Sequence, residues 1–186
     1  MRRLLITQNA TLDGSVEMLD DWFDPSGQDG VDNSDLIAEV RRQDSTADVL
    51  VTGRRTFLDM RGYWPGRTDD TTGVSAYLDR VHKYVVSRTI TDPQWRHTTT
   101  LSGDPVAEVR GLKQQQGLDI VVTGSISLCH ALIRAGLVDG YRLFTYPTVQ
   151  GRGRRLFPDG LAIPRLRVIE STSFAGGIGF TEYATV

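Results

Sequence analysis

One stretch of the sequence decides the predicted fold: Asp48-Val49-Leu50-Val51-Thr52-Gly53-Arg54-Arg55-Thr56-Phe57. Residues 48–52 form a short apolar run rich in β-branched side chains, which is typical of a buried strand. Gly53 interrupts the run, and the following residues have the composition of a helix. A strand that passes through a glycine turn into a helix places free backbone N–H groups at the carboxyl edge of a sheet. The stretch therefore predicts an α/β protein with an anion site at that turn.

The same pattern returns later in the chain. Residues 119–123 predict a buried strand, Gly124-Ser125 a turn, and residues 127–135 an amphipathic helix that Gly136 ends. Other strands are expected at 4–12, 83–87 and 141–146, a closing strand pair at 165–173 and 179–185, and other helices at 34–42, 75–81 and 105–116. Alternating strands and helices predict a largely parallel sheet with an antiparallel addition at the end.

Composition limits the function classes. A chain of 186 residues with 39% hydrophobic content suits one core, so we expect a single domain over residues 1–186. The net charge of −2 offers no bulk positive field for nucleic acid. The apolar run after Arg3 stops too soon for a signal peptide or a membrane span, so we expect a cytoplasmic protein without a membrane partner. The one cysteine, Cys129, lies in an apolar helical stretch and is expected to be buried.

Arginines follow directly after the first glycine turn. The guanidinium groups of Arg54 and Arg55 can bind phosphate through paired, charge-assisted hydrogen bonds, and the Thr56 hydroxyl can donate another. That chemistry suits a ribose 2′-phosphate, and so NADP(H) over NAD(H). The alternative is that both arginines are solvated, but a positive charge at a helix N-terminus is unfavourable unless an anion compensates it. Ser87-Arg88 forms a third polar strand end, which is a weak signal alone.

Several familiar sites are absent from the sequence. Neither glycine turn has the three spaced glycines of the standard dinucleotide fingerprint or the Gly-Lys-Ser/Thr ending of a phosphate loop. The chain has no Gly-x-Ser-x-Gly elbow, and His82, His97 and His130 lack the spacing of metal ligands. No metal site is expected.

In combination, these segments closely resemble the dihydrofolate reductase-like superfamily. Within it, the chain is most similar to the C-terminal reductase domain of the bifunctional deaminase/reductase of riboflavin biosynthesis. The Leu12-Asp13-Gly14 turn also belongs to the pattern. The segments that carry the resemblance are 51–57, 83–89, 120–125 with Leu128 and Leu132, 135–139 and 147–153.

The resemblance implies a three-layer α/β fold, with a mostly parallel central sheet flanked by helices, in a homodimer that binds NADPH. Gly53, Arg54, Arg55 and Thr56 would bind the 2′-phosphate and pyrophosphate end. Ser87 and Arg88 would flank the adenosine, and Gly124 and Ser125 would meet the pyrophosphate. The nicotinamide would lie near Ala10 and the Asp13-Gly14 turn.

The resemblance does not assign the proton donor. Dihydrofolate reductases place a carboxylate on the first helix, and Asp13, Asp32, Asp35 and Glu39 are all candidates here. The His-x-Glu and Cys-x-x-Cys signatures of a zinc deaminase are absent. A role in riboflavin biosynthesis would therefore need a separate deaminase.

Three functions are compatible with these residues. The first is an NADPH-dependent reductase of a small heterocycle, either a ribosylamino-pyrimidine, as for a 5-amino-6-(5-phosphoribosylamino)uracil reductase, or a dihydropterin. Trp22, Phe23, Tyr63 and Trp64 could stack on such a ring or pack their own loops. The second is a catalytically silent NADP(H)-binding sensor or assembly module. The third is a phosphosugar or nucleotide-binding enzyme without nicotinamide.

Overall fold

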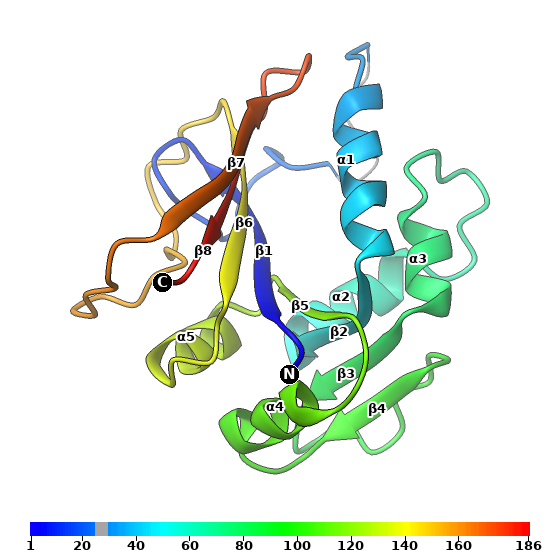
Figure 1. The fold of residues 1–186 in the computed structure, drawn as a ribbon. Coiled ribbons are helices and arrows are strands. Elements are labelled where there is room, and N and C mark those ends of the chain that lie inside the picture. Colours follow the sequence, from blue (N-terminus) through cyan, green and yellow to red (C-terminus); the bar gives the residue numbers. More distant parts are fainter. Residues whose placement is uncertain (25–29) are drawn as a thin grey trace.

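Eight strands form one mixed sheet in the computed structural model, which describes residues 1–24 and 30–186 (Figure 1). The strands are β1 (Leu4–Thr11), β2 (Ala47–Gly53), β3 (His82–Val86), β4 (Thr98–Leu101), β5 (Asp119–Thr123), β6 (Gly140–Tyr146), β7 (Arg167–Ser173) and β8 (Gly179–Ala184). The helices are α1 (Ser34–Ser45), α2 (Arg54–Tyr63), α3 (Val74–Arg80), α4 (Pro105–Gln114) and α5 (Ile126–Arg134).

The strand order is β4-β3-β2-β5-β1-β6-β8-β7. The first six strands in this order pair in parallel, whereas β8 pairs antiparallel with both β6 and β7. The prediction of a mostly parallel sheet with an antiparallel C-terminal strand pair is therefore confirmed. The order also makes β2 and β5 neighbours, so both glycine turns leave the sheet at the same edge.

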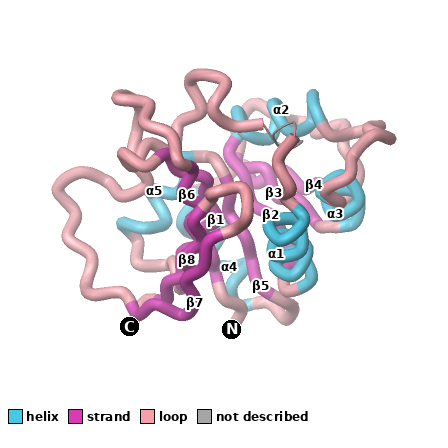
Figure 2. The backbone as a smooth tube through the Cα atoms, turned by 90° about the horizontal axis from the view of Figure 1, so that it is seen from above, coloured by secondary structure: helices cyan, strands magenta, loops and turns pink. Residues whose placement is uncertain are grey.

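Helices cover both faces of the sheet, and Figure 2 shows α5 and α1 on opposite sides of it. On one face, α4 and α5 bury Val109, Leu128 and Leu132 against β1 and β5. On the other face, α3 packs in one apolar cluster with β2 and β3, and α1 packs against the aromatic side chains of β6 and β8. Within the described residues, no helix has the length and apolar character needed to span a membrane.

The sequence did not predict β4, which we expected to be part of a polar connection. Three of its four residues are threonines, and Leu101 is its buried residue. The strand pairs in parallel with β3 at the edge of the sheet. Backbone pairing, rather than an apolar pattern, therefore creates this strand, and backbone pairing leaves little trace in a sequence.

The aromatic residues of the loops are more buried than a surface loop predicts. Trp22 is 9% exposed, and its ring meets that of Tyr146 edge-on at 5.3 Å between centroids. Trp64 is 8% exposed within the core around α2 and α3. The expected loop over 15–33 is thus anchored by Val16 and Trp22 in its first part; its residues 25–29 lie outside the described residues.

Gly140 gives a test of how closely β6 and β8 approach. A Cβ atom at this position would lie 2.6 Å from the Tyr183 carbonyl oxygen and 3.0 Å from Leu5 Cδ2. We expect Gly140→Ala to lower the free energy of unfolding by roughly 1–3 kcal/mol, because backbone must move to relieve the clash. Gly111→Ala on the open surface of α4, where a Cβ meets nothing within 4 Å, should raise it by roughly 0.5–1 kcal/mol. Urea unfolding measures both, and equal effects would contradict the assigned strand contact.

Candidate functional site

The two glycine turns are hydrogen-bonded to each other. The Gly53 N–H donates to Ser125 Oγ at 2.8 Å, and the Ser125 N–H donates to Thr56 Oγ1 at 2.9 Å. Each hydroxyl oxygen accepts a backbone N–H, so its own hydrogen is free to point elsewhere. The turn between β2 and α2 and the turn between β5 and α5 therefore form one continuous surface at the carboxyl edge of the sheet.

Gly124 is required for this close approach. Its φ is +56°, and a Cβ atom here would lie 2.8 Å from Thr56 Cγ2. The Gly124 carbonyl accepts a hydrogen bond from Gln8 Nε2 at 2.6 Å and one from Cys129 Sγ at 3.3 Å. Burial raises the pKa of the Cys129 thiol to about 12, so the sulfur stays a neutral thiol. The prediction that Cys129 is buried is confirmed.

Neither helix at this edge has a compensating acid in its own first turn, although the charge of Arg55 acts on the Glu17 carboxylate of the cavity lining. Neither α2 nor α5 has a side-chain cap or an acidic residue in its first turn. Arg54 and Arg55 are exposed and make no hydrogen bond or ion pair within residues 1–24 and 30–186. Helix N-termini attract anions, and arginine adds charge-assisted donors. The edge therefore has the charge and the free donors that favour an anion, and anion binding there stays a prediction.

A cavity of about 780 Å³ extends from this edge into the space between α1 and the sheet. Six of the ten predicted cofactor residues line it, namely Gly53, Arg54, Arg55, Thr56, Gly124 and Ser125. The other four, Ala10, Gly14, Ser87 and Arg88, do not. The Ser87 hydroxyl oxygen instead accepts hydrogen bonds from the Thr89 and Ile90 N–H groups. A cofactor role for all ten residues stays a prediction.

The middle of the cavity is apolar on both sides. Ile37 and Val40 of α1 line one side, and Leu50, Val121 and Phe144 of the sheet line the other. Of the loop aromatics considered for ring stacking, Phe23 and Trp64 line the cavity, whereas Trp22 and Tyr63 do not. These walls suit a flat, mostly apolar ring.

The sheet side of the cavity also carries a row of three polar residues on neighbouring strands. Thr7 of β1 is in register with Thr123 of β5 on one side and with Arg142 of β6 on the other. All three residues line the cavity. Since neighbouring strands lie about 4.8 Å apart, the Cα atoms of Thr123 and Arg142 are separated by roughly 10 Å. The row leads from the glycine turn at Gly124 toward Arg142.

Two loops form the rim of the cavity. The Asp13 carboxylate accepts hydrogen bonds from the Gln150 and Gly151 N–H groups, at 3.2 and 2.7 Å. Arg154 pairs with Glu17 at 2.7 Å between Nη2 and Oε1, and both line the cavity. The turn after β1 and the glycine- and arginine-rich loop after β6 are thereby held together.

The first two candidate proton donors serve the backbone. Hydrogen bonds from the Thr11 hydroxyl and from the Gln150 and Gly151 N–H groups lower the pKa of Asp13 to about 2. Asp32 accepts from the Ser34 N–H at 2.9 Å, and this bond lowers the pKa of its carboxyl. Both groups are therefore ionised at neutral pH.

The other two candidates also accept hydrogen bonds, Asp35 from the turn between β7 and β8 and Glu39 from within α1. Asp35 accepts a hydrogen bond at 2.7 Å from the Ala175 N–H, in the turn between β7 and β8. Burial alone would raise the pKa of Glu39, but hydrogen bonds from Arg42 and Gln43 outweigh it and lower that pKa. None of the four candidates lines the cavity. Their role as proton donor stays a prediction.

A different carboxyl, Asp44 in the last turn of α1, does line the cavity. Burial raises the pKa of Asp44 to about 7, although the charges of Arg80 and Arg142 act in the opposite direction. Sequence reasoning missed this residue. A signal was available, because an acidic side chain in the last turn of a helix is unfavourable to the helix dipole and so calls for an explanation.

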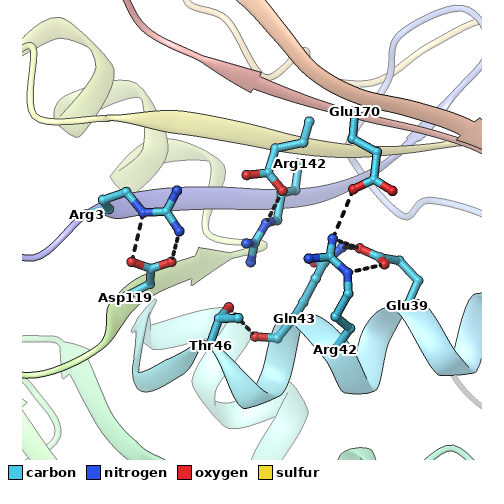
Figure 3. Close-up of polar contacts among 9 residues, drawn as sticks. Arg3, Glu39, Arg42, Gln43, Thr46, Asp119, Arg142 and Glu170 are labelled. Carbon is cyan, nitrogen blue, oxygen red and sulfur yellow. Dashed lines mark hydrogen bonds and ion pairs between the residues drawn. The ribbon is translucent and has the colours of Figure 1, made fainter.

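Arg142 is the second residue that the sequence did not reveal. It is 2% exposed, and its Nε donates to Glu182 Oε2 at 2.9 Å, while its Nη1 has no hydrogen-bond partner among the residues that the structure describes. Figure 3 shows its guanidinium group between the sheet and α1, near Gln43. The signal here was a charged residue inside the apolar strand Tyr141-Arg142-Leu143-Phe144.

The histidines lie outside the cavity. His82 contacts Thr99 Oγ1 at 2.9 Å, and His130 contacts the Arg155 carbonyl oxygen at 3.0 Å. In the part of the chain that the structure describes, no cluster of histidine, cysteine and acidic side chains could hold a metal ion.

The sheet order and the cavity between α1 and the sheet define a dihydrofolate reductase-like α/β protein. A sequence profile of the RibD C-terminal domain matches residues 2–180, and the chain belongs to that family. The uncharacterized protein YyaP of Bacillus subtilis is 29% identical over 185 residues, which cover 95% of this chain and 92% of YyaP.

Solved structures share the fold at lower identity. A pyrimidine reductase-like protein from Corynebacterium diphtheriae superposes with a TM-score of 0.65 and 16% identity, over 100% of this chain and 92% of that one. The diaminohydroxyphosphoribosylaminopyrimidine deaminase/5-amino-6-(5-phosphoribosylamino)uracil reductase of Thermotoga maritima gives a TM-score of 0.66 and 16% identity. The match covers 100% of this chain and 57% of the Thermotoga protein.

The raised pKa of Asp44 predicts a pH-dependent stability. A carboxyl whose pKa is about 7 when folded and near 3.8 when unfolded takes up a proton on folding between these values. The free energy of unfolding should therefore fall as pH rises from 4 to 8. We compare the free energy of unfolding of Asp44→Asn with that of the unmodified protein at pH 5 and at pH 8. After allowance for solvent screening, this difference should shift in favour of Asp44→Asn by on the order of 1–2 kcal/mol from pH 5 to pH 8. Urea unfolding at both pH values measures this, and a constant difference would contradict it.

Proposed function

We propose that this protein is an NADPH-dependent reductase that transfers a hydride to a small heterocycle. The observation that carries the proposal is the joined pair of glycine turns, with two uncapped helix N-termini and the Arg54-Arg55 pair, opening into one cavity. An anion site at one end of an apolar-walled cavity suits a phosphate-bearing cofactor beside an unsaturated ring.

The residues present fit the phosphates of NADPH. The N–H groups of the first turn of α2 and the two guanidinium groups supply donors, and the hydroxyl hydrogens of Thr56 and Ser125 are free to join them. The preference for NADPH over NADH would come from Arg54 and Arg55, because a 2′-phosphate adds a charge that these exposed side chains can neutralise.

The cofactor and the protein would therefore have different roles in the reaction. Bound NADPH would supply the hydride. The chain's own residues would orient the reactants: the turns fix the phosphates, and Ile37, Val40, Leu50 and Phe144 enclose the ring and exclude water. The family and the name of the Thermotoga protein favour a pyrimidinone ring, with a dihydropterin as the other ring of similar shape.

A second function is supported by the position of the acids. Because Asp13, Asp32, Asp35 and Glu39 all lie outside the cavity, a chain that kept the cofactor site without a proton donor would act as an NADP(H)-binding sensor or assembly module. Asp44 is the residue that separates this function from the first. It lines the cavity and exchanges its proton near neutral pH, as a catalytic acid would.

The arginine pair predicts the cofactor preference. Calorimetry should show tighter binding of NADPH than of NADH, and Arg54→Ala or Arg55→Ala should weaken NADPH binding tenfold or more, since each charge-assisted contact contributes roughly 1.5–3 kcal/mol. NADH binding should change little in either variant. Arg134→Ala, in the last turn of α5, removes the same charge elsewhere and serves as the control. Equal affinities of the unmodified protein for NADPH and NADH would contradict the assignment of Arg54 and Arg55 to the 2′-phosphate.

Turnover separates the enzyme from the sensor. We expect absorbance-monitored oxidation of NADPH with a ribosylamino-pyrimidinone or a dihydropterin, and a loss of at least tenfold in kcat in Asp44→Asn if this carboxyl supplies the proton. Binding of NADPH without oxidation by pyrimidinone, pterin or quinone substrates would favour the sensor.

A further inference from the structure

The polar side chains that line the cavity away from the glycine turns include three that act on one another electrostatically. Asp44 comes from the last turn of α1, Tyr77 from α3 and Arg142 from the third position of β6. Since α1 ends at Ser45 and β2 begins at Ala47, Asp44 lies toward the amino edge of the sheet, opposite the edge that carries the turns. Arg142 lies two strands across the sheet from Thr123, so the cavity has a second polar end away from the Gly124 turn.

These groups interact without satisfying one another. The charge of Arg142 acts on both Asp44 and Tyr77, yet Asp44 and Arg142 form no ion pair within 4.0 Å. In the described chain, the Asp44 carboxyl makes no hydrogen bond or ion pair, and Arg142 Nη1 is buried without a partner. A buried guanidinium nitrogen normally has a hydrogen-bond partner. Because both groups line the cavity, a ligand group that accepts from Arg142 and donates to Asp44 would satisfy both.

The local charges favour a neutral ligand group. The positive charge of Arg142 is already paired with Glu182, whose side chain is 8% exposed. Glu39 is likewise paired with Arg42, and Glu170 lies 3.1 Å from the same guanidinium group. An anionic ligand group would meet the Glu182 carboxylate and the ionised form of Asp44 together, which like-charge repulsion disfavours. A group that carries both a carbonyl oxygen and an N–H avoids this cost.

The apolar walls set the shape of the ligand. Ile37 and Val40 on α1 face the sheet side chains Leu50 and Val121 across the cavity. We propose that this end of the cavity binds the cis-amide edge of a flat lactam ring, whose carbonyl accepts from Arg142 and whose ring N–H donates to Asp44. This assignment rests on the proposed function, because it gives the orientation of the ring that receives the hydride.

The first test changes the ligand and leaves the protein intact. Uracil carries ring N–H groups beside its carbonyls, whereas 1,3-dimethyluracil has the same ring and carbonyls without N–H. Ligand-observed NMR titration should show that uracil binds at least tenfold more tightly than the dimethyl compound. Equal binding, or no binding of uracil at millimolar concentration, would overturn the proposal.

The second test changes Asp44. In Asp44→Ala, the preference for uracil over 1,3-dimethyluracil should fall to about twofold or less, while the affinity for the dimethyl compound is kept, which also shows that the cavity is folded. Asp159→Ala is the control, because Asp159 is exposed and has no hydrogen bond or ion pair within the described residues, and it should keep the full preference. A preference that survives in Asp44→Ala would overturn the assignment of this carboxyl.

Titration with and without saturating NADPH keeps the two proposals separate. If the protein distinguishes the two uracils but does not bind NADPH, the proposed reductase function is contradicted and the lactam site is supported. Binding and oxidation of NADPH without such discrimination would overturn the lactam site and leave the reductase function standing.

Discussion

The hydrogen bonds between the two glycine turns are the constraint on which the site depends. The Gly53 N–H and the Thr56 hydroxyl both bind Ser125, and they can do so because β2 and β5 are neighbouring parallel strands. Gly124 permits the approach, since any larger residue would collide with Thr56. Two helix N-termini are thereby fixed side by side, and the cavity begins where they meet.

The opposite end of the cavity is organised by buried charge. Removing Arg142 and Glu182 from water is unfavourable, and the ion pair between them offsets only part of that cost. Two apolar side chains at the same positions in the sheet would avoid this cost. The unpartnered Nη1 of Arg142 and the half-buried Asp44 both line the cavity, and they are the groups to which we propose that a polar ligand binds.

The sequence predicted the elements better than it predicted the site. Apolar runs and glycine stops placed the strands and helices, because burial in a sheet or on a helix face leaves a periodic pattern. The edge strand β4 was missed because backbone pairing formed it. The acids near the start of α1 were reasonable candidates by position, yet each is used by nearby N–H groups or arginines. Asp44, ten residues into α1, lies on the cavity instead.

The sequence by itself determined the α/β alternation, the two strand-turn-helix units and the position of Arg54 and Arg55 directly after the Gly53 turn. These are local properties, set by residue type and by spacing within about ten residues. Only the tertiary structure decided which turns meet and that Asp44, rather than the acids near the start of α1, lines the cavity. Thr123, Thr7 and Arg142 come together through the strand order β5-β1-β6, although the chain separates Thr7 from Arg142 by most of its length. Strand pairing across such distances depends on the packing of the whole core, which no local pattern records.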